Sequence, residues 1–411
     1  MTVTGDDVQA INLLSAATWA DGQPLDRFHR LREHRPVHWH PYSGPDRRYG
    51  NGFWAVTSYE GVHTVLRRTD LYSSHGYLGA LEPPEEVQRR SAFIMLDDPR
   101  HALLRKTISG MFTPRMVRRR EERFREIARD IVDELTGRDG CDLVSDIAGK
   151  MASYVGADLL GIPRSDAVAL YRHVETIHGV SDAQDPEAVR AARRAEVEYC
   201  RRVWRDKRAN PADDVATRLA FGTVGDEPMD EEAFVANLGL LVHGSSDTTR
   251  NVIAGGILAL LRAPDQRALL TQDLDGLIGP AVEEMLRWLS PVAHVYRIAT
   301  RDTVLLGQPI RRGDPVVPWY GAANHDPAVF EDPGRFDVRR SPNPHIAFGF
   351  SGHYCLGVHV GRLQARVMVS EVLRRLPDLE LAGPVRWLAS SLVSGPETMP
   401  VRFSPPRPGT G

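Results

Sequence analysis

The stretch "FGFSGHYCLG", residues 348–357, places a lone cysteine, Cys355, between a loop of small residues and an apolar-periodic segment. That segment, residues 356–376, predicts a helix that begins directly after the cysteine. A thiolate at a helix N-terminus receives unpaired backbone N–H groups and the positive end of the helix dipole, and both favour the anion. The position therefore suits a thiol that ligates a metal or acts as a nucleophile.

Spacing alone leaves three interpretations of Cys355 open. Lone cysteines are often simply small buried residues. A zinc site with His353 and His359 is conceivable, although a structural zinc site needs a fourth ligand. The third interpretation is a haem iron bound through the thiolate, because glycines let the backbone approach a flat macrocycle closely. The glycines in question are Gly349, Gly352 and Gly357.

Composition indicates an ordinary globular chain of 411 residues, 42% apolar and 26% charged. A formal net charge of -3 gives no global electrostatic reason to expect nucleic acid or a membrane surface as partner. The cysteines Cys141, Cys200 and Cys355 lie far apart, which predicts no disulfide framework. Since neither a signal sequence nor an apolar run of about 18 residues is present, we expect a cytoplasmic protein without membrane spans.

Helical periodicity dominates the chain, and short strands are expected near both ends. Because the sequence shows neither internal repeats nor an obvious linker, we expect residues 1–411 to form one mainly α domain with small β-sheets. Residues 1–20 are expected to be a lead-in and residues 404–411 a loose tail. The predicted helices are 144–160, 166–177, 186–208, 231–261, 264–272, 280–289 and 356–376, with an exposed loop at 83–90, a strand pair and helix within 48–68, and hairpins within 296–318.

The cysteine stretch closely resembles the ligand loop of the cytochrome P450 family of haem-thiolate monooxygenases, in its soluble bacterial form. Phe348, His353 and Gly357 stand at the positions that the family pattern occupies around its cysteine. The resemblance implies a cytochrome P450 fold in which Cys355 is the axial ligand of the iron of haem b. One position departs from the pattern, because Ser351 stands where the family usually has glycine.

A second match is the pair Glu284 and Arg287 in "EEMLR", three residues apart on one predicted helix face. Arg335 in "FEDPGRFD" matches the third member of the buried Glu-Arg-Arg cluster of the family. Such a cluster would fix the scaffold of the haem loop. Removing one partner would leave a buried charge unpaired, at a cost of several kcal/mol.

The haem propionates have their own candidate partners. "DDPRHALLRKTISGMFTPR" resembles the helix that crosses the haem edge, with His101 and Arg105 four apart on one face. Arg297 and His353 match the other usual propionate partners. Arginine–carboxylate contacts are charge-assisted and often bidentate, so this set suits two carboxylates.

The polar residues 244–251 interrupt the apolar helix predicted over 231–262, which is 32 residues and about 48 Å long. Buried hydroxyls there need hydrogen bonds, which serine and threonine obtain from the carbonyl four residues earlier. By resemblance, Asp247 and Thr248 are the acid and alcohol that help deliver protons during dioxygen activation. Ser245 replaces a customary glycine, where its hydroxyl would narrow the groove, join the proton chain or hold a polar substrate group.

Electrons are expected from a separate protein, because the sequence has no flavin or NAD(P) fingerprint. In the family, the face nearest the cysteine receives a ferredoxin or flavodoxin, which is reduced by its reductase. Basic residues in "TPRMVRRREERFRE" would steer an acidic partner, although a solvated helix face is the alternative. These residues are Arg115, Arg118, Arg119 and Arg120.

Substrate contacts are expected from residues 77–93, 242–246, 292–295 and 394–398. These segments combine apolar side chains with His75, His294 and Ser394, which suits many small organic molecules, including macrolides, terpenes, steroids and carrier-bound amino acids. The resemblance implies a dioxygen-dependent enzyme that hydroxylates or epoxidises such a molecule in bacterial secondary metabolism. Coupling, desaturation, cyclisation or a non-catalytic haem sensor are the alternatives.

Overall fold

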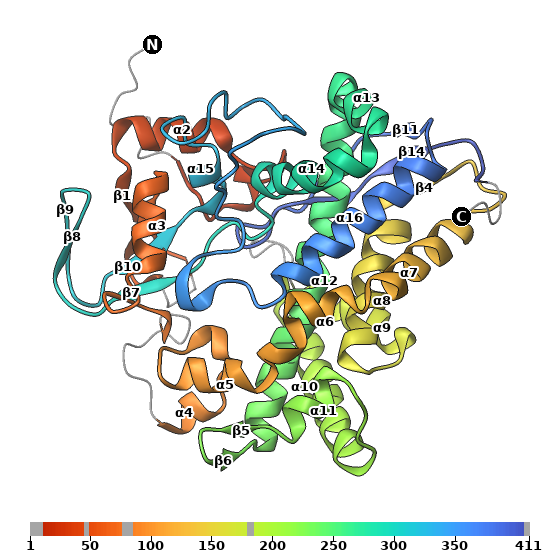
Figure 1. Cartoon of the computed structure of the whole chain (residues 1–411). Helices are drawn as coiled ribbons and strands as arrows, with labels where there is room; N and C mark the ends of the chain where they lie inside the picture. Colours follow the sequence, from red (N-terminus) through yellow and green to blue (C-terminus); the bar gives the residue numbers. More distant parts are fainter. Residues whose placement is uncertain (1–10, 45–48, 76–84, 179–184, 407–411) are drawn as a thin grey trace.

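Helix α12 (Glu231–Arg262) runs through the centre of the molecule in the computed structural model, which describes residues 11–44, 49–75, 85–178 and 185–406 (Figure 1). Its start follows from capping, because the Asp230 side chain accepts a hydrogen bond from the Ala233 N–H. Glu231 and Glu232 in the first turn complement the helix dipole. The helix predicted over these residues is thus confirmed at both ends.

Most other described residues are helical, which confirms the mainly α fold class. The longer helices are α2 (Leu25–His34), α3 (Tyr59–Arg67), α5 (Arg100–Ser109), α7 (Glu121–Asp133), α8 (Gly149–Leu160), α9 (Arg164–His178), α10 (Pro186–Ala209), α13 (Pro264–Gln272), α14 (Leu274–Leu289) and α16 (Val358–Arg375). The shorter ones are α4 (Glu85–Arg89), α6 (Pro114–Arg118), α11 (Val215–Ala220), α15 (Tyr320–Asn324), the π-helix η6 (Val144–Ala148), and the 3-10 turns η1 (Ala16–Thr18), η4 (Phe93–Met95), η5 (Gly110–Phe112) and η7 (Ser351–His353).

The largest sheet has five strands in the order β1-β2-β10-β7-β3. Its members are β1 (Val37–Pro41), β2 (Gly52–Val56), β3 (Tyr72–Ser73), β7 (Arg297–Ala299) and β10 (Pro315–Pro318). Strand β10 pairs with β2 in parallel, and the other pairs are antiparallel. The smaller sheets use β4 (Gly140–Asp142), β5 (Thr223–Val224), β6 (Glu227–Pro228), β8 (Thr303–Leu305), β9 (Gln308–Ile310), β11 (Glu380–Leu381), β12 (Arg386–Trp387), β13 (Pro396–Thr398) and β14 (Pro400–Arg402).

The strands β1, β2, β7 and β10 gather with α2 and α3 on one side of α12, and α7, α8 and α9 lie on the other (Figure 1). The main apolar core joins the helices, whereas two smaller cores lie on the two faces of the five-stranded sheet. In one of these, Trp19, Phe28 and Trp319 pack with ring centroids 5.7 to 6.1 Å apart. The site described below lies where α5 contacts the cysteine loop before α16, and α12 packs on α16.

Two predicted boundaries differ from the structure. The helix expected from residue 280 already begins at Leu274, because Asp273 caps it by accepting from the Gly276 N–H, and Pro280 lies inside it. The loop expected at 83–90 contains the short helix α4, while residues 76–84 lie outside the described part. The lead-in and the tail are described only from residue 11 and up to residue 406.

Candidate active site

The cysteine loop ends where α16 begins, with Gly357 as N-cap residue. The Cys355 N–H donates to the Phe348 carbonyl over 2.9 Å, which closes the loop. Inside it, Gly349 has φ +72° and Ser351 has φ +59°. Both are left-handed, a conformation that glycine adopts freely and other residues at a cost of roughly 1–2 kcal/mol. The serine that departs from the family pattern therefore keeps the turn of the loop at the price of backbone strain.

Burial raises the pKa of the Cys355 thiol, whereas a hydrogen bond from the Gly357 backbone and the charges of Arg105 and Arg362 act in the opposite direction. The helix end thus favours the thiolate as expected, but without a bound metal the effect of burial is larger, so the pKa of Cys355 is raised. A bound metal cation deprotonates a coordinating thiol outright. The other two thiols, Cys141 and Cys200, have their pKa raised to about 12, first of all by burial.

The zinc interpretation of this region is wrong. The His353 ring stacks on the His101 ring with centroids 4.0 Å apart, and His353 Nε2 lies 3.0 Å from Ser74 Oγ. Across the described residues, no three His, Cys, Asp or Glu side chains are grouped so that they could hold a metal ion. A single thiolate ligand with the remaining coordination supplied by a macrocycle is consistent with this arrangement.

Arginine and histidine side chains gather beside the cysteine loop. His101 Nδ1 lies 2.9 Å from Asp98 Oδ1, but His101 Nε2 is buried without a hydrogen-bond partner. Burial first, and then the charges of Arg297, His101 and Arg105, lower the pKa of His353 to about 2. Such a crowded cluster with an orphaned ring nitrogen fits an anionic partner. The residues that the sequence proposed for the haem propionates are therefore brought together, and they fit that group.

Three hydroxyls in the polar part of α12 bond back within the helix. Ser245 and Ser246 donate to the Val242 carbonyl over 3.1 and 2.7 Å, and Thr248 donates to the Gly244 carbonyl over 3.0 Å. This is the predicted pattern for buried serine and threonine. A Cβ added at Gly244 would meet no atom within 4 Å, so α12 has open space one turn before Thr248.

Ser245 is directed at α8. A Cβ added at Gly156 of α8 would lie 3.0 Å from Ser245 Oγ, so the missing side chain at Gly156 makes room for the serine. The hydroxyl is engaged with its own helix and with this helix contact. The contact with Gly156 therefore explains by packing how a serine fits at a position where the family usually has glycine. The three chemical roles considered for Ser245 stay predictions.

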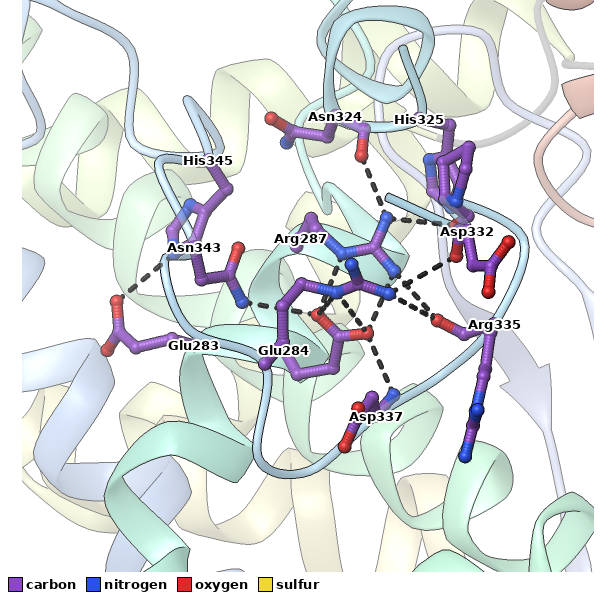
Figure 2. Close-up of polar contacts among 12 residues, drawn as sticks. Glu283, Glu284, Arg287, Asn324, His325, Asp332, Arg335, Asp337, Asn343 and His345 are labelled. Carbon is purple, nitrogen blue, oxygen red and sulfur yellow. Dashed lines mark hydrogen bonds and ion pairs between the residues drawn. The ribbon is translucent and has the colours of Figure 1, made fainter. Parts of the chain in front are cut away.

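The predicted Glu-Arg-Arg cluster exists, but one member was wrong. Arg287 holds Glu284 through Nε and Nη2 over 2.7 and 2.8 Å, and both side chains are fully buried. The second guanidinium belongs to Arg340, whose Nε lies 3.1 and 3.2 Å from the carboxylate oxygens. Arg335 offers only its carbonyl to Arg287 and Arg340, and its side chain points away from Glu284 (Figure 2).

Sequence reasoning missed Arg340 because two arginines, Arg339 and Arg340, follow Arg335 within five residues. Nothing local distinguishes which of them reaches back to α14. Sequence reasoning also missed the two partners of Glu283. Arg362 pairs with this carboxylate over 2.6 Å, and His345 lies 3.1 Å from it. Contacts of this kind depend on the path of the loop between α15 and α16.

Two of the expected substrate segments meet. Val292 and Val393 form an isolated antiparallel bridge, and the Ser394 N–H donates to the Pro291 carbonyl over 2.9 Å. His294, expected to be a polar group of the pocket, instead packs on Trp319 with centroids 4.5 Å apart. Its Nδ1 lies 2.9 Å from the Ser391 carbonyl, so one ring nitrogen is already engaged, and its contact with substrate stays a prediction. His75 lies 3.7 Å from Asp97, and residues 77–84 lie outside the described part.

The expected basic patch is only partly available to a partner. Arg115, Arg118 and Arg119 are exposed on and directly after α6. Arg120 is half-buried and pairs with Asp158 of α8 over 3.4 Å. Within the residues that the structure describes, no helix combines the length and the apolar character needed to cross a bilayer.

Comparison with known proteins agrees with this geometry. The sequence model described as Cytochrome P450 matches residues 187–379. A methyl-branched lipid omega-hydroxylase of Mycobacterium bovis is 36% identical over 96% of this chain and 95% of the relative. A steroid C26-monooxygenase of Mycolicibacterium smegmatis is 35% identical over 97% of both chains.

A solved structure, that of a Mycobacterium marinum cytochrome P450 in complex with pseudoionone, has the same fold. It superposes with a TM-score of 0.87 at 34% identity and covers 96% of this chain and 98% of its own. Relatives that are themselves hydroxylases and monooxygenases favour an enzyme over the sensor alternative. With relatives this similar over nearly its whole length, the chain belongs to the cytochrome P450 family and is a monooxygenase of organic molecules that binds haem b through a cysteine thiolate.

Proposed function

We propose that Cys355 is the thiolate ligand and that this enzyme hydroxylates the apolar end of a lipid-like or steroid-like molecule. The observation that carries the ligand assignment is the position of Cys355: it is half-buried just before α16, beside a cluster of arginine and histidine side chains in which His101 Nε2 has no hydrogen-bond partner. Bound haem supplies dioxygen activation and oxygen-atom transfer. The protein supplies binding, orientation and protons.

In this proposal, three sets of residues would hold the cofactor. Cys355 would bind the iron, Phe348 and Gly357 would shape the loop around the thiolate, and the arginine–histidine cluster beside the loop would bind the propionates. The members of that cluster are His101, Arg105, Arg297 and His353. Arg105 already donates to the Tyr354 carbonyl of the cysteine loop, so it links α5 to the ligand before any haem contact.

Asp247 and Thr248 are proposed to handle the protons. Thr248 Oγ1 lies beside the open space at Gly244, where a water molecule or dioxygen has room. Asp247 is only 1% exposed, so this carboxylate is shielded from bulk solvent next to Thr248. A buried acid next to an alcohol is a suitable pair for relaying protons.

The apolar substrate is supported by the relatives and by the segments around the site. Of the two relatives described above, one is a methyl-branched lipid omega-hydroxylase and the other is a steroid C26-monooxygenase. In this chain, Phe93, Val242 and Val295 are buried within the segments expected to contact substrate. A low-to-high-spin shift in an optical titration with branched fatty acids and steroids, but not with polar macrolides, would support this class. A shift with macrolides alone would contradict it.

The ligand assignment is tested by the reduced carbon monoxide spectrum. We expect Cys355→Ser to lose the thiolate-type band, while Cys141→Ser and Cys200→Ser, which remove the other two thiols, keep it. A thiolate-type band in purified Cys355→Ser protein would refute the assignment. Haem content measured on the same samples separates loss of the ligand from loss of the cofactor.

We further propose that a ferredoxin, or a flavodoxin, with its reductase docks near α6. Exposed Arg115 and Arg118 support this, because local positive charge steers an acidic partner. Neutralising both to glutamine should slow reduction by ferredoxin several-fold at low salt and weaken its salt dependence. Exposed Arg193 of α10 is the matched control, and equal rates in both variants would remove this patch from consideration. The cytoplasmic location and a place in secondary metabolism stay predictions.

A further inference from the structure

Arg250 is one of the largest fully buried side chains, with 1% of its surface exposed. It lies on α12, three residues after Asp247, and its Nη2 is 3.3 Å from Asp247 Oδ1. Burying a guanidinium is costly unless its charge and its N–H groups find partners. The identity of those partners shows what the residue does.

Two further partners come from another helix, α9. Arg250 Nη1 donates to the Tyr171 hydroxyl and, over 2.7 Å, to Glu175 Oε1. Its guanidinium carbon also lies 5.3 Å from the centre of the Tyr171 ring. Burial acts to lower the pKa of Arg250, but Tyr171, Asp247 and Glu175 together raise it above its usual value. The arginine is therefore charged, and it joins the polar turn of α12 to α9.

The arrangement divides one positive charge between two carboxylates. The Asp247 side chain is 2% exposed, whereas the Glu175 side chain is 39% exposed. Because both carboxylates interact with the same guanidinium, weakening the contact to Glu175 strengthens the net attraction between Arg250 and Asp247. A change in the position of α9 therefore changes the electrostatic environment of the buried Asp247 carboxylate.

Several other charged groups on elements next to α12 pair with groups other than Asp247 and Arg250. On α8, Lys150 pairs with Glu134, and Asp158 pairs with Arg120 and Arg123. On η6, Asp146 pairs with Arg138. On α10, Glu196 contacts His243, one turn before Asp247. On α14, Glu284 and Arg287 pair with each other, and on β13, Glu397 pairs with Arg386.

We propose that Arg250 is a positioning residue: it fixes the direction and charge of Asp247 and couples that carboxylate to α9 through Tyr171 and Glu175. The proposal rests on the proposed role of Asp247 in proton delivery. It adds that this role is adjusted from a helix that holds none of the groups assigned to haem binding or proton transfer above.

The test uses the haem-loaded enzyme with a surrogate ferredoxin and records product formed per NAD(P)H as a function of pH. Asp247→Asn identifies the limb of this profile that depends on Asp247. Because a buried carboxylate without its cation has a raised pKa, Arg250→Gln should move that limb upward by about one pH unit or more. Glu175→Gln should move it downward, because Arg250 then serves Asp247 alone. Arg250→Lys, which keeps the charge, should restore much of the limb.

A second readout does not depend on turnover. Hydrogen exchange of the α9 amides, residues 164–178, should become roughly tenfold faster in Arg250→Gln and remain unchanged in Asp247→Asn. The thiolate-type carbon monoxide band confirms that each variant is folded and loaded. If Arg250→Gln does not fold, Glu175→Gln and Tyr171→Phe carry the test, because their residues lie on the less buried side of the cluster.

The outcomes separate the two proposals. If the limb disappears in Asp247→Asn but stays at its original pH in both Arg250→Gln and Glu175→Gln, the coupling through Arg250 is refuted and the role of Asp247 stands. If the limb persists in Asp247→Asn, the role of Asp247 is refuted and the coupling with it. Opposite shifts in Arg250→Gln and Glu175→Gln support the coupling.

Discussion

Two acid–arginine pairs with the same three-residue spacing lie on helices that contact each other, and they serve different purposes. Glu284 and Arg287 lie on α14, and Asp247 and Arg250 lie on α12. In both pairs the helix places the two side chains on one face. All four residues are 1% exposed or less. What separates the pairs is the set of partners that the rest of the chain brings to them.

The α14 cluster, formed by Glu284, Arg287 and Arg340, has all its charges paired within the cluster. Its one carboxylate, Glu284, accepts from the two arginines, from the Asp337 N–H and from Asn343 Nδ2 (Figure 2). The arginines use their other N–H groups on main-chain carbonyls of the segment before the cysteine loop. These carbonyls belong to Asn324, Glu331, Asp332, Pro333 and Arg335. A saturated network of this kind fixes a loop in one conformation.

The α12 cluster, formed by Asp247, Arg250, Tyr171 and Glu175, is shared between two helices. One guanidinium, that of Arg250, interacts with two carboxylates, and one of them, Glu175, lies on α9 and is partly exposed to solvent. Its electrostatic balance therefore depends on where α9 lies relative to α12. The comparison teaches that a buried ion pair acts as scaffold when its partners are immobile loop groups, and as an adjustable element when a second helix competes for the charge.

The largest expected effect is on the α14 cluster. Glu284→Gln leaves Arg287 and Arg340 without their carboxylate, so we expect the free energy of unfolding to fall by about 3–5 kcal/mol. Haem content should fall with it, because the cysteine loop loses its support. Chemical denaturation of purified protein measures the first effect, and absorbance per protein measures the second. A loss below about 1 kcal/mol would mean that the cluster is not the scaffold described above.

In the polar turn of α12, we expect a substitution to change activity strongly and stability little. Thr248→Ala removes a hydroxyl that bonds within its own helix, so stability should change by less than about 1 kcal/mol. Product per NAD(P)H should fall roughly tenfold or more, with hydrogen peroxide as the alternative product, because proton delivery is impaired. Thr248→Ser keeps the hydroxyl and should restore coupling. Undiminished coupling in Thr248→Ala would place the proton route elsewhere.

A smaller effect concerns Glu283, the neighbour of Glu284 on the outer side of α14. Burial opposes ionisation, but hydrogen bonds from His345 and Arg362 lower the pKa of Glu283 to about 2. Because this pKa lies below the unfolded value of about 4.3, the carboxylate stabilises the fold above pH 4.3, and this contribution is lost as the pH falls towards 2. Wild type should exceed Glu283→Gln in stability by about 1 kcal/mol near neutral pH. The difference should shrink in acid; a constant difference would contradict the assignment.

The smallest effect is a gain. Ser351→Gly removes the side chain from a left-handed position in the cysteine loop, φ +59°, and should stabilise the protein by about 1 kcal/mol. Asp332 in the scaffold segment has φ +43° and is the matched control. Aspartate tolerates this conformation better, so Asp332→Gly should gain less. Equal gains in thermal stability would show that the strain is not specific to the serine.

The sequence alone determined the family, the fold class and the central elements of the site. Cys355 at a helix start, the polar turn at 244–251 and the pair Glu284 and Arg287 are all read from short spacings. Helix α12 was predicted with its observed bounds, Glu231–Arg262, because its apolar periodicity is a local signal; its acidic first turn and the capping Asp230 are local as well. Interactions within one or two helical turns leave such traces in the sequence.

Only the tertiary structure decided which distant groups meet. It replaced Arg335 by Arg340, directed Ser245 at Gly156, placed His294 on Trp319 and gave Arg250 its partners on α9. The three-residue spacing on α12 and on α14 is the same, so spacing could not tell a scaffold from an adjustable pair. That difference arises from residues 37 to 79 positions away in the chain, which only the packing of helices and loops brings within hydrogen-bonding distance.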